Sequence, residues 1–283
     1  MLQRNYKHIT VSPASAAVGA EIGGIDLRQV NEDQFAEVKQ AFADHGVIFF
    51  RDQSFTPEEH IQFAERWGDI NVNRFFTPLA DYPMIAEVRK EPEAKMNIGG
   101  GWHTDHSYDQ IPALGSILYA REVPEIGGDT LFASMYLAYE GLSDGLKEML
   151  HGLNAVHSSR HTFGAEAISK DASVAGRFQN AENATQDSIH PVIITHPLSG
   201  RKSLYINPDF TLHFEGWSRE ESLPLMNYLF EQASLPQNTC RFQWRNNTIA
   251  FWDNRATWHY ALNDYHGKRR VMHRITIEGV ELH

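Results

Sequence analysis

The chain has 283 residues, and its hydrophobic content of 42% is enough to bury one large core or two small ones. No linker-like stretch divides it, so a single domain over 1–283 is expected, and a formal net charge of -11 argues against nucleic acid as a partner. The sequence lacks an apolar run of bilayer length and a signal-like start, and it has one cysteine, Cys240. A cytoplasmic protein without membrane contact is therefore expected.

Two helices are predicted early in the chain. The first spans 31–44 and ends at Gly46, before a strand over 47–51. Its apolar residues on one face are Phe35, Val38 and Phe42. The second begins at 56–59, where a proline occupies the first turn and a glutamate completes a capping box. The first helix is thus predicted from its apolar pattern and its terminating glycine, and the second from its start signals.

The segment 102–105 reads Trp-His-Thr-Asp. On an extended strand His103 and Asp105 point to the same side, so an imidazole and a carboxylate would face one metal ion. The spacing alone is weak, because 15 histidines and 36 acidic residues produce such pairs by chance. A surface ion pair or a buried, hydrogen-bonded histidine is the plain alternative.

Between 160 and 190 the chain turns polar, with little apolar periodicity. Such a stretch is typical of an active-site lid, and a plain surface excursion explains it equally well. A third helix is predicted to begin at Ser218 with Glu221 in its capping box, and to brace a sheet. The residues that would pack there are Leu223, Leu225, Met226 and Leu229. In the strand-like stretch that follows, Cys240 is expected to be a buried, inert thiol.

His259 is the best candidate for a third metal ligand. It follows an apolar strand that runs into a polar turn within 251–260. Two histidines and one aspartate fill one face of an octahedral Fe(II) and leave the other face open for a cosubstrate, O2 and water. Closed structural zinc sites lack those open positions, although a catalytic zinc site also uses three ligands and a water.

Two arginines follow in the strand-like run 268–280. Arg270 and Arg274 fall on one face of a strand, so both guanidinium groups can enter one cavity. A planar guanidinium binds a carboxylate through two parallel hydrogen bonds. One arginine would hold the distal carboxylate of an iron-chelating oxoacid and the other an anionic group of the substrate. A basic strand edge that discourages aggregation is the alternative reading.

Taken together, these motifs resemble the Fe(II)/2-oxoglutarate-dependent dioxygenases of the taurine dioxygenase family, which includes aryloxyalkanoate dioxygenases. The resemblance runs over nearly the whole chain, with its motifs in the family's order. The matching pieces are 18–27 (VGAEIGGIDL), 102–105 (WHTD), 124–130 (PEIGGDT), 252–255 (WDNR), His259, Arg270 and Arg274.

The resemblance implies a mainly β fold with flanking helices, a double-stranded β-helix or jelly roll, with its helices on one outer face. It implies that His103, Asp105 and His259 bind Fe(II). It further implies that Thr130 and Arg270 bind the far carboxylate of the cosubstrate 2-oxoglutarate, while Arg274 faces the acidic group of a small anionic substrate. O2 would then hydroxylate that substrate as 2-oxoglutarate is decarboxylated to succinate.

The sequence departs from the taurine-specific pattern where the substrate should lie. A taurine enzyme is expected to carry a histidine near Asn73 and a tyrosine near Phe76, and neither is present. The loss leaves a more apolar pocket, in which Asn73, Phe76 and Tyr108 are the predicted substrate contacts. Core packing is the common alternative for the two aromatic residues. An aryloxyalkanoate, alkylsulfonate or sulfate ester is thus a better expected substrate than taurine.

Two other function classes remain open at this stage. A zinc hydrolase would use the same three ligands, but it needs a general base and has no use for Thr130 with Arg270. A non-catalytic jelly-roll protein that binds a small molecule is the other, because fold does not fix function. By analogy with similar enzymes, a homo-oligomer is expected, either a dimer or a tetramer.

Overall fold

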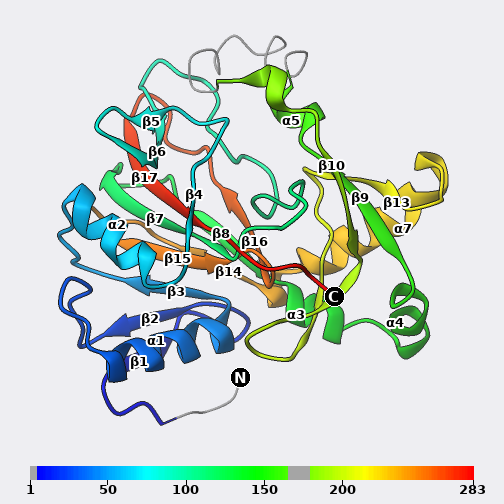
Figure 1. Cartoon of the computed structure of the whole chain (residues 1–283), viewed down its shortest axis with the longest axis horizontal. Coiled ribbons are helices and arrows are strands. Elements are labelled where there is room, and N and C mark those ends of the chain that lie inside the picture. The colour runs from blue at the N-terminus through cyan, green and yellow to red at the C-terminus, as the bar shows by residue number, and fades with distance from the viewer. Residues whose placement is uncertain (1–4, 165–178) are drawn as a thin grey trace.

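The computed structural model describes residues 5–164 and 179–283 and shows two facing layers of β-sheet, the predicted jelly roll (Figure 1). The larger layer is a nine-stranded sheet. Its strands are β1 (Thr10–Pro13), β2 (Ala20–Gly23), β3 (Val47–Phe50), β4 (Ile70–Asn71), β5 (Pro78–Leu79), β6 (Tyr82–Lys90), β7 (Gly115–Glu122), β15 (Ile249–Asp253) and β17 (Arg270–Ile277).

Smaller sheets form the second layer. One of them has the order β14-β8-β16, another β10-β9-β13, and a third pairs β11 with β12. Their bounds are β8 (Thr130–Ser134), β9 (Asn154–Ser158), β10 (Asp187–Pro191), β11 (Ile193–Thr195), β12 (Lys202–Leu204), β13 (Thr211–Phe214), β14 (Thr239–Phe242) and β16 (Thr257–Ala261). In the described part of the chain, pairing is antiparallel except between β2 and β3.

The centre of the large sheet is built from strands that are distant in the sequence. Its order is β1-β2-β3-β15-β7-β17-β6-β5, with β4 also paired to β17. The strand β17 therefore lies between β7 and β6, and Arg270 and Arg274 project from a strand that is hydrogen-bonded on both sides. A doubly paired strand is a rigid base for ligand-binding side chains.

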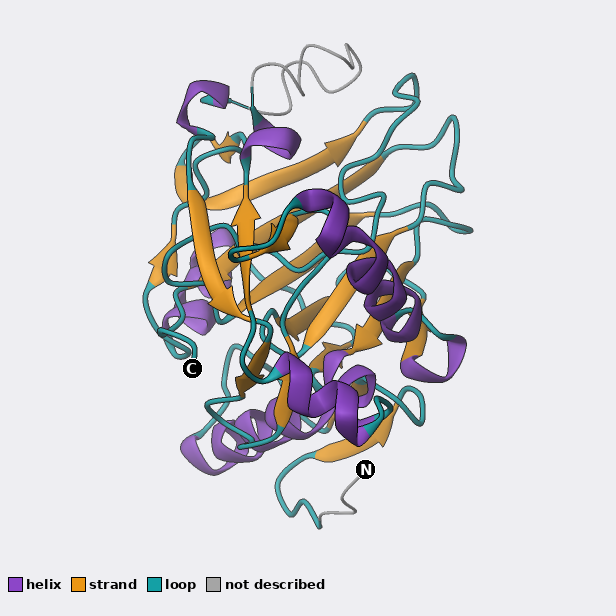
Figure 2. Ribbon diagram, turned by 90° about the vertical axis from the view of Figure 1, so that its right-hand side faces the viewer, coloured by secondary structure: helices purple, strands orange, loops and turns teal. Residues whose placement is uncertain are grey.

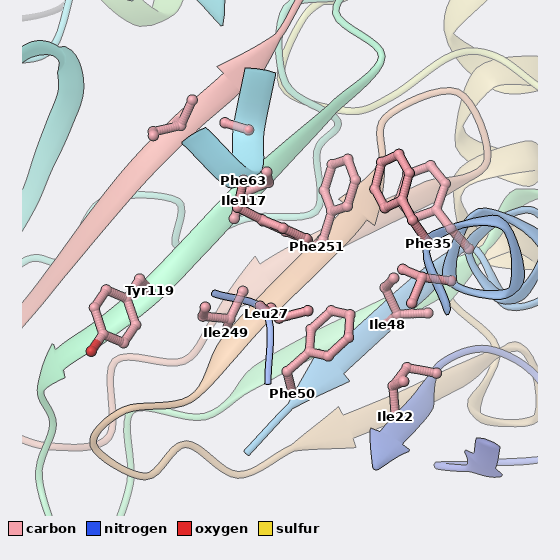
Figure 3. Packing of buried hydrophobic residues seen from close by; sticks show 14 of the residues in the cluster. Ile22, Leu27, Phe35, Ile48, Phe50, Phe63, Ile117, Tyr119, Ile249 and Phe251 are labelled. Carbon is pink, nitrogen blue, oxygen red and sulfur yellow. The ribbon is translucent and has the colours of Figure 1, made fainter. Parts of the chain in front are cut away.

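Helices α1 (Glu32–His45) and α2 (Pro57–Glu65) pack on the outer face of the large sheet, and the apolar face predicted for α1 is buried there. Figure 3 shows Phe35 and Phe63 meeting Ile48, Phe50 and Phe251 of the sheet. The capping box predicted for α2 is present, and α1 has one as well, at Asn31. Gly46 ends α1 with a φ of 72°, and a Cβ there would lie 2.8 Å from Thr257 Cγ2, so only glycine fits this turn.

The two sheets meet at a second core of large aromatic residues. Phe49 stacks on Phe242 with ring centroids 3.7 Å apart, and Phe132 meets Phe49 and Trp252 at 5.6 and 5.9 Å. Cys240 is a buried free thiol, as expected, and burial raises its pKa to about 12. These contacts join the layers below the open end of the roll, where the metal ligands lie.

Helices flank the roll on two sides, so the expectation of one helical face is wrong. A second group packs against the smaller sheets (Figure 2), where Leu229 of the helix 219–233 shares a core with Ala133, Ala155 and Trp258. Without these helices, the outer apolar face of the smaller sheets would be exposed to solvent. The need to bury that face explains the extra layer. This group comprises α3 (Met135–Glu140), α4 (Asp144–Leu150) and α7 (Arg219–Ala233), whereas the short α5 (Arg160–Phe163) lies apart and packs Phe163 against Phe75.

The predicted third helix corresponds to α7, which begins after Ser218 with the expected capping box. Met226 and Leu229 are buried against the sheets, but Leu223 is 42% exposed and belongs to the outer face. No helix in 5–164 or 179–283 is both long and apolar enough to cross a bilayer.

His60, a buried histidine of α2, predicts acid sensitivity of the fold. His60 is 1% exposed, and burial, with Arg121 and His273 nearby, lowers its pKa to about 3 from the usual 6.5. Between pH 6.5 and 3 the unfolded chain therefore binds a proton at His60 that the folded chain does not bind. The free energy of unfolding consequently decreases as the pH is lowered from 6.5 to 3. We expect His60→Leu to remove about 2 kcal/mol of the stability loss between pH 7.5 and 5. Urea unfolding at both pH values measures this, and equal losses in wild type and variant would contradict it.

Candidate active site

The predicted site residues converge on a cavity of about 220 Å³ at the open end of the roll. All but one of them line it. Those residues are Phe76, His103, Asp105, Tyr108, Thr130, His259, Arg270 and Arg274. The exception is Asn73, which lies outside the lining. Strands β8, β16 and β17 thus deliver side chains from distant parts of the sequence to one pocket.

The two histidines are tied together through their backbones. The His103 N–H donates to His259 O at 3.1 Å, and the His259 N–H donates to His103 O at 2.8 Å. His259 lies in β16, but 102–105 is no extended strand, and that expectation is wrong. Only His103 pairs, as an isolated bridge, because glycines precede it and His106 follows with a left-handed φ of 60°. The local two-residue spacing still brings Asp105 to the same side.

The three ligand side chains form a compact, buried cluster. Their ligating atoms lie within 4.8 Å of one another, and Asp105 oxygens are 3.9 Å from Nε2 of both His103 and His259. His103 Nδ1 is 2.9 Å from Gly101 O, so the proton is on Nδ1 and Nε2 presents its lone pair to the cluster. Burial and the neighbouring His103 lower the pKa of His259, which keeps it neutral. Neutral imidazoles and a carboxylate are a suitable ligand set for Fe(II).

Two hydrogen bonds fix the Asp105 carboxylate. Ser116 Oγ donates to Oδ2 at 2.7 Å, and Arg274 Nη1 donates to Oδ1 at 3.1 Å. Burial opposes ionisation of Asp105, but Arg274 and the two histidines outweigh it and hold its pKa below the usual range. Sequence reasoning missed Ser116, since a serine in an apolar strand carries no signal of its partner.

The WDNR motif holds the turn that leads to His259. Arg255 makes two hydrogen bonds to Asp253, at 2.8 and 2.7 Å, and His196 Nε2 lies 2.9 Å from the same carboxylate. Asn254 also stabilises this turn, because its backbone oxygen accepts a 2.6 Å hydrogen bond from the Thr104 hydroxyl. The motif therefore fastens the β15–β16 turn to the segment between the other two ligands.

Arg270 and Thr130 form a separate anion site in the cavity. Arg270 is 6% exposed, and its Nε and Nη2 find no hydrogen-bond partner among the described residues. Burial lowers the pKa of this guanidinium. Thr130 Oγ1 accepts from Trp244 Nε1 at 2.9 Å, which leaves the hydroxyl proton free to donate. A buried cation without an acceptor requires an anionic ligand, and a carboxylate fits. A zinc hydrolase would have no use for this site.

Aromatic residues surround Arg274 at the substrate end. The Arg274 guanidinium lies 4.3 Å from the centre of the Phe76 ring, and Tyr108 is packed against Phe210 at 4.8 Å. Burial raises the pKa of Tyr108, so its phenol is neutral. Of the expected lid, Phe163 lines the cavity, while 165–178 lie outside the described residues. Asn97, another lining residue, was missed because nothing in its local pattern marks it.

Fold and site together define a jelly-roll enzyme with an open metal centre of two histidines and one aspartate, beside a buried anion site. A family model described as taurine catabolism dioxygenase TauD, TfdA family, matches residues 10–276. The chain belongs to this family, and the expected enzyme class, an Fe(II)/2-oxoglutarate-dependent dioxygenase, is confirmed.

Similar proteins cover nearly the whole chain. An alkylsulfatase of Acinetobacter baylyi is 35% identical over 98% of this chain and 87% of its own. An (S)-phenoxypropionate/alpha-ketoglutarate dioxygenase of Sphingobium herbicidovorans is 28% identical, covering 95% and 94% of the two chains. A solved taurine dioxygenase from Burkholderia xenovorans has a TM-score of 0.81 and 32% identity, covering 96% and 92%. The expected cofactors, Fe(II) and 2-oxoglutarate, are confirmed.

Proposed function

We propose that this enzyme oxidises small organic anions with an apolar body, with alkyl sulfate esters and alkylsulfonates first and aryloxyalkanoates second. The observation that carries this proposal is the pairing of one buried arginine, Arg274, with apolar walls in a cavity of about 220 Å³. The walls include Phe76, Val88, Ile98, Leu118, Phe163 and Phe210. The sulfate ester and sulfonate preference is further supported by the 35% identical alkylsulfatase.

Each end of the cavity has its own task. His103, Asp105 and His259 would hold Fe(II), and Thr130 with Arg270 would bind the far carboxylate of 2-oxoglutarate. Fe(II) with 2-oxoglutarate supplies oxidation by O2, coupled to decarboxylation of the cosubstrate. Arg274 would bind the anionic group of the substrate, and thereby decide which carbon lies nearest the metal ligands.

The chemistry of the product follows from the carbon that is hydroxylated. One oxygen atom of O2 goes to the substrate C–H bond and the other to succinate, with release of CO2. If the hydroxylated carbon carries a sulfate ester, its C–O bond breaks to give an aldehyde and inorganic sulfate. A sulfonate gives an aldehyde and sulfite, and an aryloxyalkanoate gives a phenol and an oxoacid. The released fragment therefore identifies the substrate class.

The first experiment is an anaerobic titration of the apo-protein with Fe(II) and 2-oxoglutarate, followed by its visible charge-transfer band. Succinate release is then measured in air with hexyl sulfate, hexanesulfonate, phenoxypropionate and taurine. Sulfate or sulfite release with the two hexyl compounds is the expected result. Turnover restricted to taurine would contradict the proposed substrate class, and absence of the band would contradict the proposed site.

Arg274 is expected to act on substrate binding while sparing iron. Arg274→Ala removes the cation that binds the anionic group, so we expect KM for hexyl sulfate to rise at least thirtyfold, from a loss of about 2 kcal/mol or more. Loss of the Arg274 bond to Asp105 weakens iron binding, but at saturating Fe(II) the charge-transfer band with 2-oxoglutarate should remain, because the three metal ligands, Ser116 and Arg270 are untouched. An unchanged KM in this variant would remove Arg274 from substrate binding.

Other expectations stay predictions. The chain is proposed to act as a single domain and to form a dimer or tetramer in the cytoplasm. Light scattering after gel filtration measures the oligomeric state.

A further inference from the structure

Asn73, expected to touch the substrate, faces a buried histidine instead. Its Nδ2 lies 3.1 Å from His106 Nε2, and His106 Nδ1 lies 2.8 Å from Asp109 Oδ2. We propose that Asp109, His106 and Asn73 form a hydrogen-bond relay that positions Phe76, and through it Arg274, for substrate binding. The relay itself is read from geometry, and only its kinetic test rests on the proposed function.

The direction of every hydrogen bond in the relay is determined. Asn73 Oδ1 accepts the backbone N–H groups of Phe75 and Phe76 at 2.9 and 3.0 Å, so the amide cannot be flipped. Its NH2 group must then donate to His106 Nε2, which has to carry a lone pair. The His106 proton is therefore on Nδ1 and is donated to Asp109. Each member has one orientation that satisfies all the others.

The relay ends at the substrate anion site. The backbone N–H bonds from Asn73 fix the turn that carries Phe76, whose ring lies 4.3 Å from the Arg274 guanidinium. Arg274 in turn donates to the metal ligand Asp105 at 3.1 Å. A shift of Phe76 would remove the surface on which Arg274 stacks, and would free the guanidinium to rotate away from the substrate.

The other end of the relay is anchored in the protein. Arg74 donates to Asp109 Oδ1 at 2.5 Å, and His190 Nε2 lies 3.0 Å from the Asp109 backbone oxygen. His106 is 2% exposed and Asp109 is 9% exposed, so water competes little with these bonds. The polar side-chain atoms of Asn73, His106 and Asp109 all have partners, and a buried network that is satisfied in this way is rigid, which is what a positioning role requires.

Two substitutions of His106 distinguish a role of its side chain in the relay from a role of its left-handed backbone conformation. His106 has a φ of 60°, a conformation that asparagine tolerates better than glutamine. Backbone strain alone therefore predicts that H106N is the milder change. The relay predicts the reverse, because a glutamine amide reaches the position of Nε2 and can accept from Asn73, whereas an asparagine amide reaches only that of Nδ1.

The test compares H106N, H106Q and Asn73→Ala with a control, Asn71→Ala. Asn71 Nδ2 donates to Glu278 Oε1 at 2.9 Å in an exposed hydrogen bond, and Asn71 does not line the cavity. We expect H106N and Asn73→Ala to raise KM for hexyl sulfate roughly tenfold or more, and to lower the ratio of aldehyde to succinate. H106Q and the control should keep both near wild type, and all four should keep the Fe(II)/2-oxoglutarate band.

Three outcomes would overturn the relay. They are H106N performing as well as H106Q, Asn73→Ala with the wild-type KM, and loss of the band in H106N, which would assign His106 to metal binding instead. If wild type oxidises none of the tested anions, the proposed substrate class fails. The relay is then tested independently by crystal structures of H106N and H106Q. A Phe76 ring displaced only in H106N supports the relay, and the same ring position in both variants overturns it.

Discussion

Asp105→Ala is expected to abolish turnover and to prevent stable iron binding. The side chain supplies the one carboxylate among the three metal ligands, and both of its oxygens are held in place, by Ser116 and Arg274. Loss of partners outside the ligand set already costs about 10- to 100-fold in metal affinity or activity, so loss of a ligand should exceed 100-fold. Iron content after gel filtration and the charge-transfer band measure binding independently of turnover.

Asp209 offers the matched control for this variant. It also lines the cavity and its Oδ2 lies 3.8 Å from His103 Nδ1, but that nitrogen is already bonded to Gly101 O at 2.9 Å, and Asp209 lies outside the ligand cluster. Asp209→Ala should therefore retain stoichiometric iron and the band. Equal iron loss in both variants would mean that general negative charge in the cavity, and not ligation by Asp105, holds the metal.

Arg270→Met is expected to have opposite effects on cosubstrate binding and on stability. Truncating one partner of a buried charge pair costs about 2–5 kcal/mol, so KM for 2-oxoglutarate should rise by about 30-fold or more. In the apo-protein, however, Arg270 is a buried cation whose Nε and Nη2 have no partner among the described residues. Methionine removes that desolvation cost and keeps the length of the side chain, so the apo-variant should melt at a higher temperature than wild type.

Thermal melting with and without 2-oxoglutarate and metal checks both halves. Wild type should gain stability on adding the cosubstrate with a metal, and Arg270→Met should gain little, because only the native state of wild type binds it well. Arg269→Met is the control, since Arg269 is an exposed neighbour paired with Glu91 and Glu122. A lower melting temperature in apo Arg270→Met would show that the guanidinium stabilises the empty pocket.

The helices and the arginine strand were predictable because their signals are local. The capping boxes at Thr56 and Ser218 depend on residues within one turn, and both occur as expected; a third, at Asn31, was not predicted. Asn31 was counted inside the helix but is its cap. The alternation from Arg270 to Arg274 needs only strand geometry, and the structure places both side chains in the cavity. Local chemistry fixes such elements whatever their distant partners are.

The metal cluster was found by combining local spacing with the family resemblance, and the remainder needed tertiary structure. The His103 and Asp105 side chains converge although 102–105 is not a strand, because a backbone bridge to His259 takes over the role of strand pairing. The hydrogen bonds from Ser116 to Asp105 and from Asn73 to His106 were not predicted, because no sequence signal marks them. Their partners lie on other segments, and single polar residues do not show which way they face.

The central position of β17 also constrains the order in which the protein can fold. β6 and β7 precede it by most of the chain, and neither pairs with the other, because β17 lies between them. Until β17 inserts, each of these strands exposes an unpaired edge, which is a template for aggregation. Such distant pairing is slow, so a nascent chain would carry these edges for much of its synthesis. High-yield expression of this enzyme should therefore depend on chaperones that cover these edges more than on the stability of the finished fold.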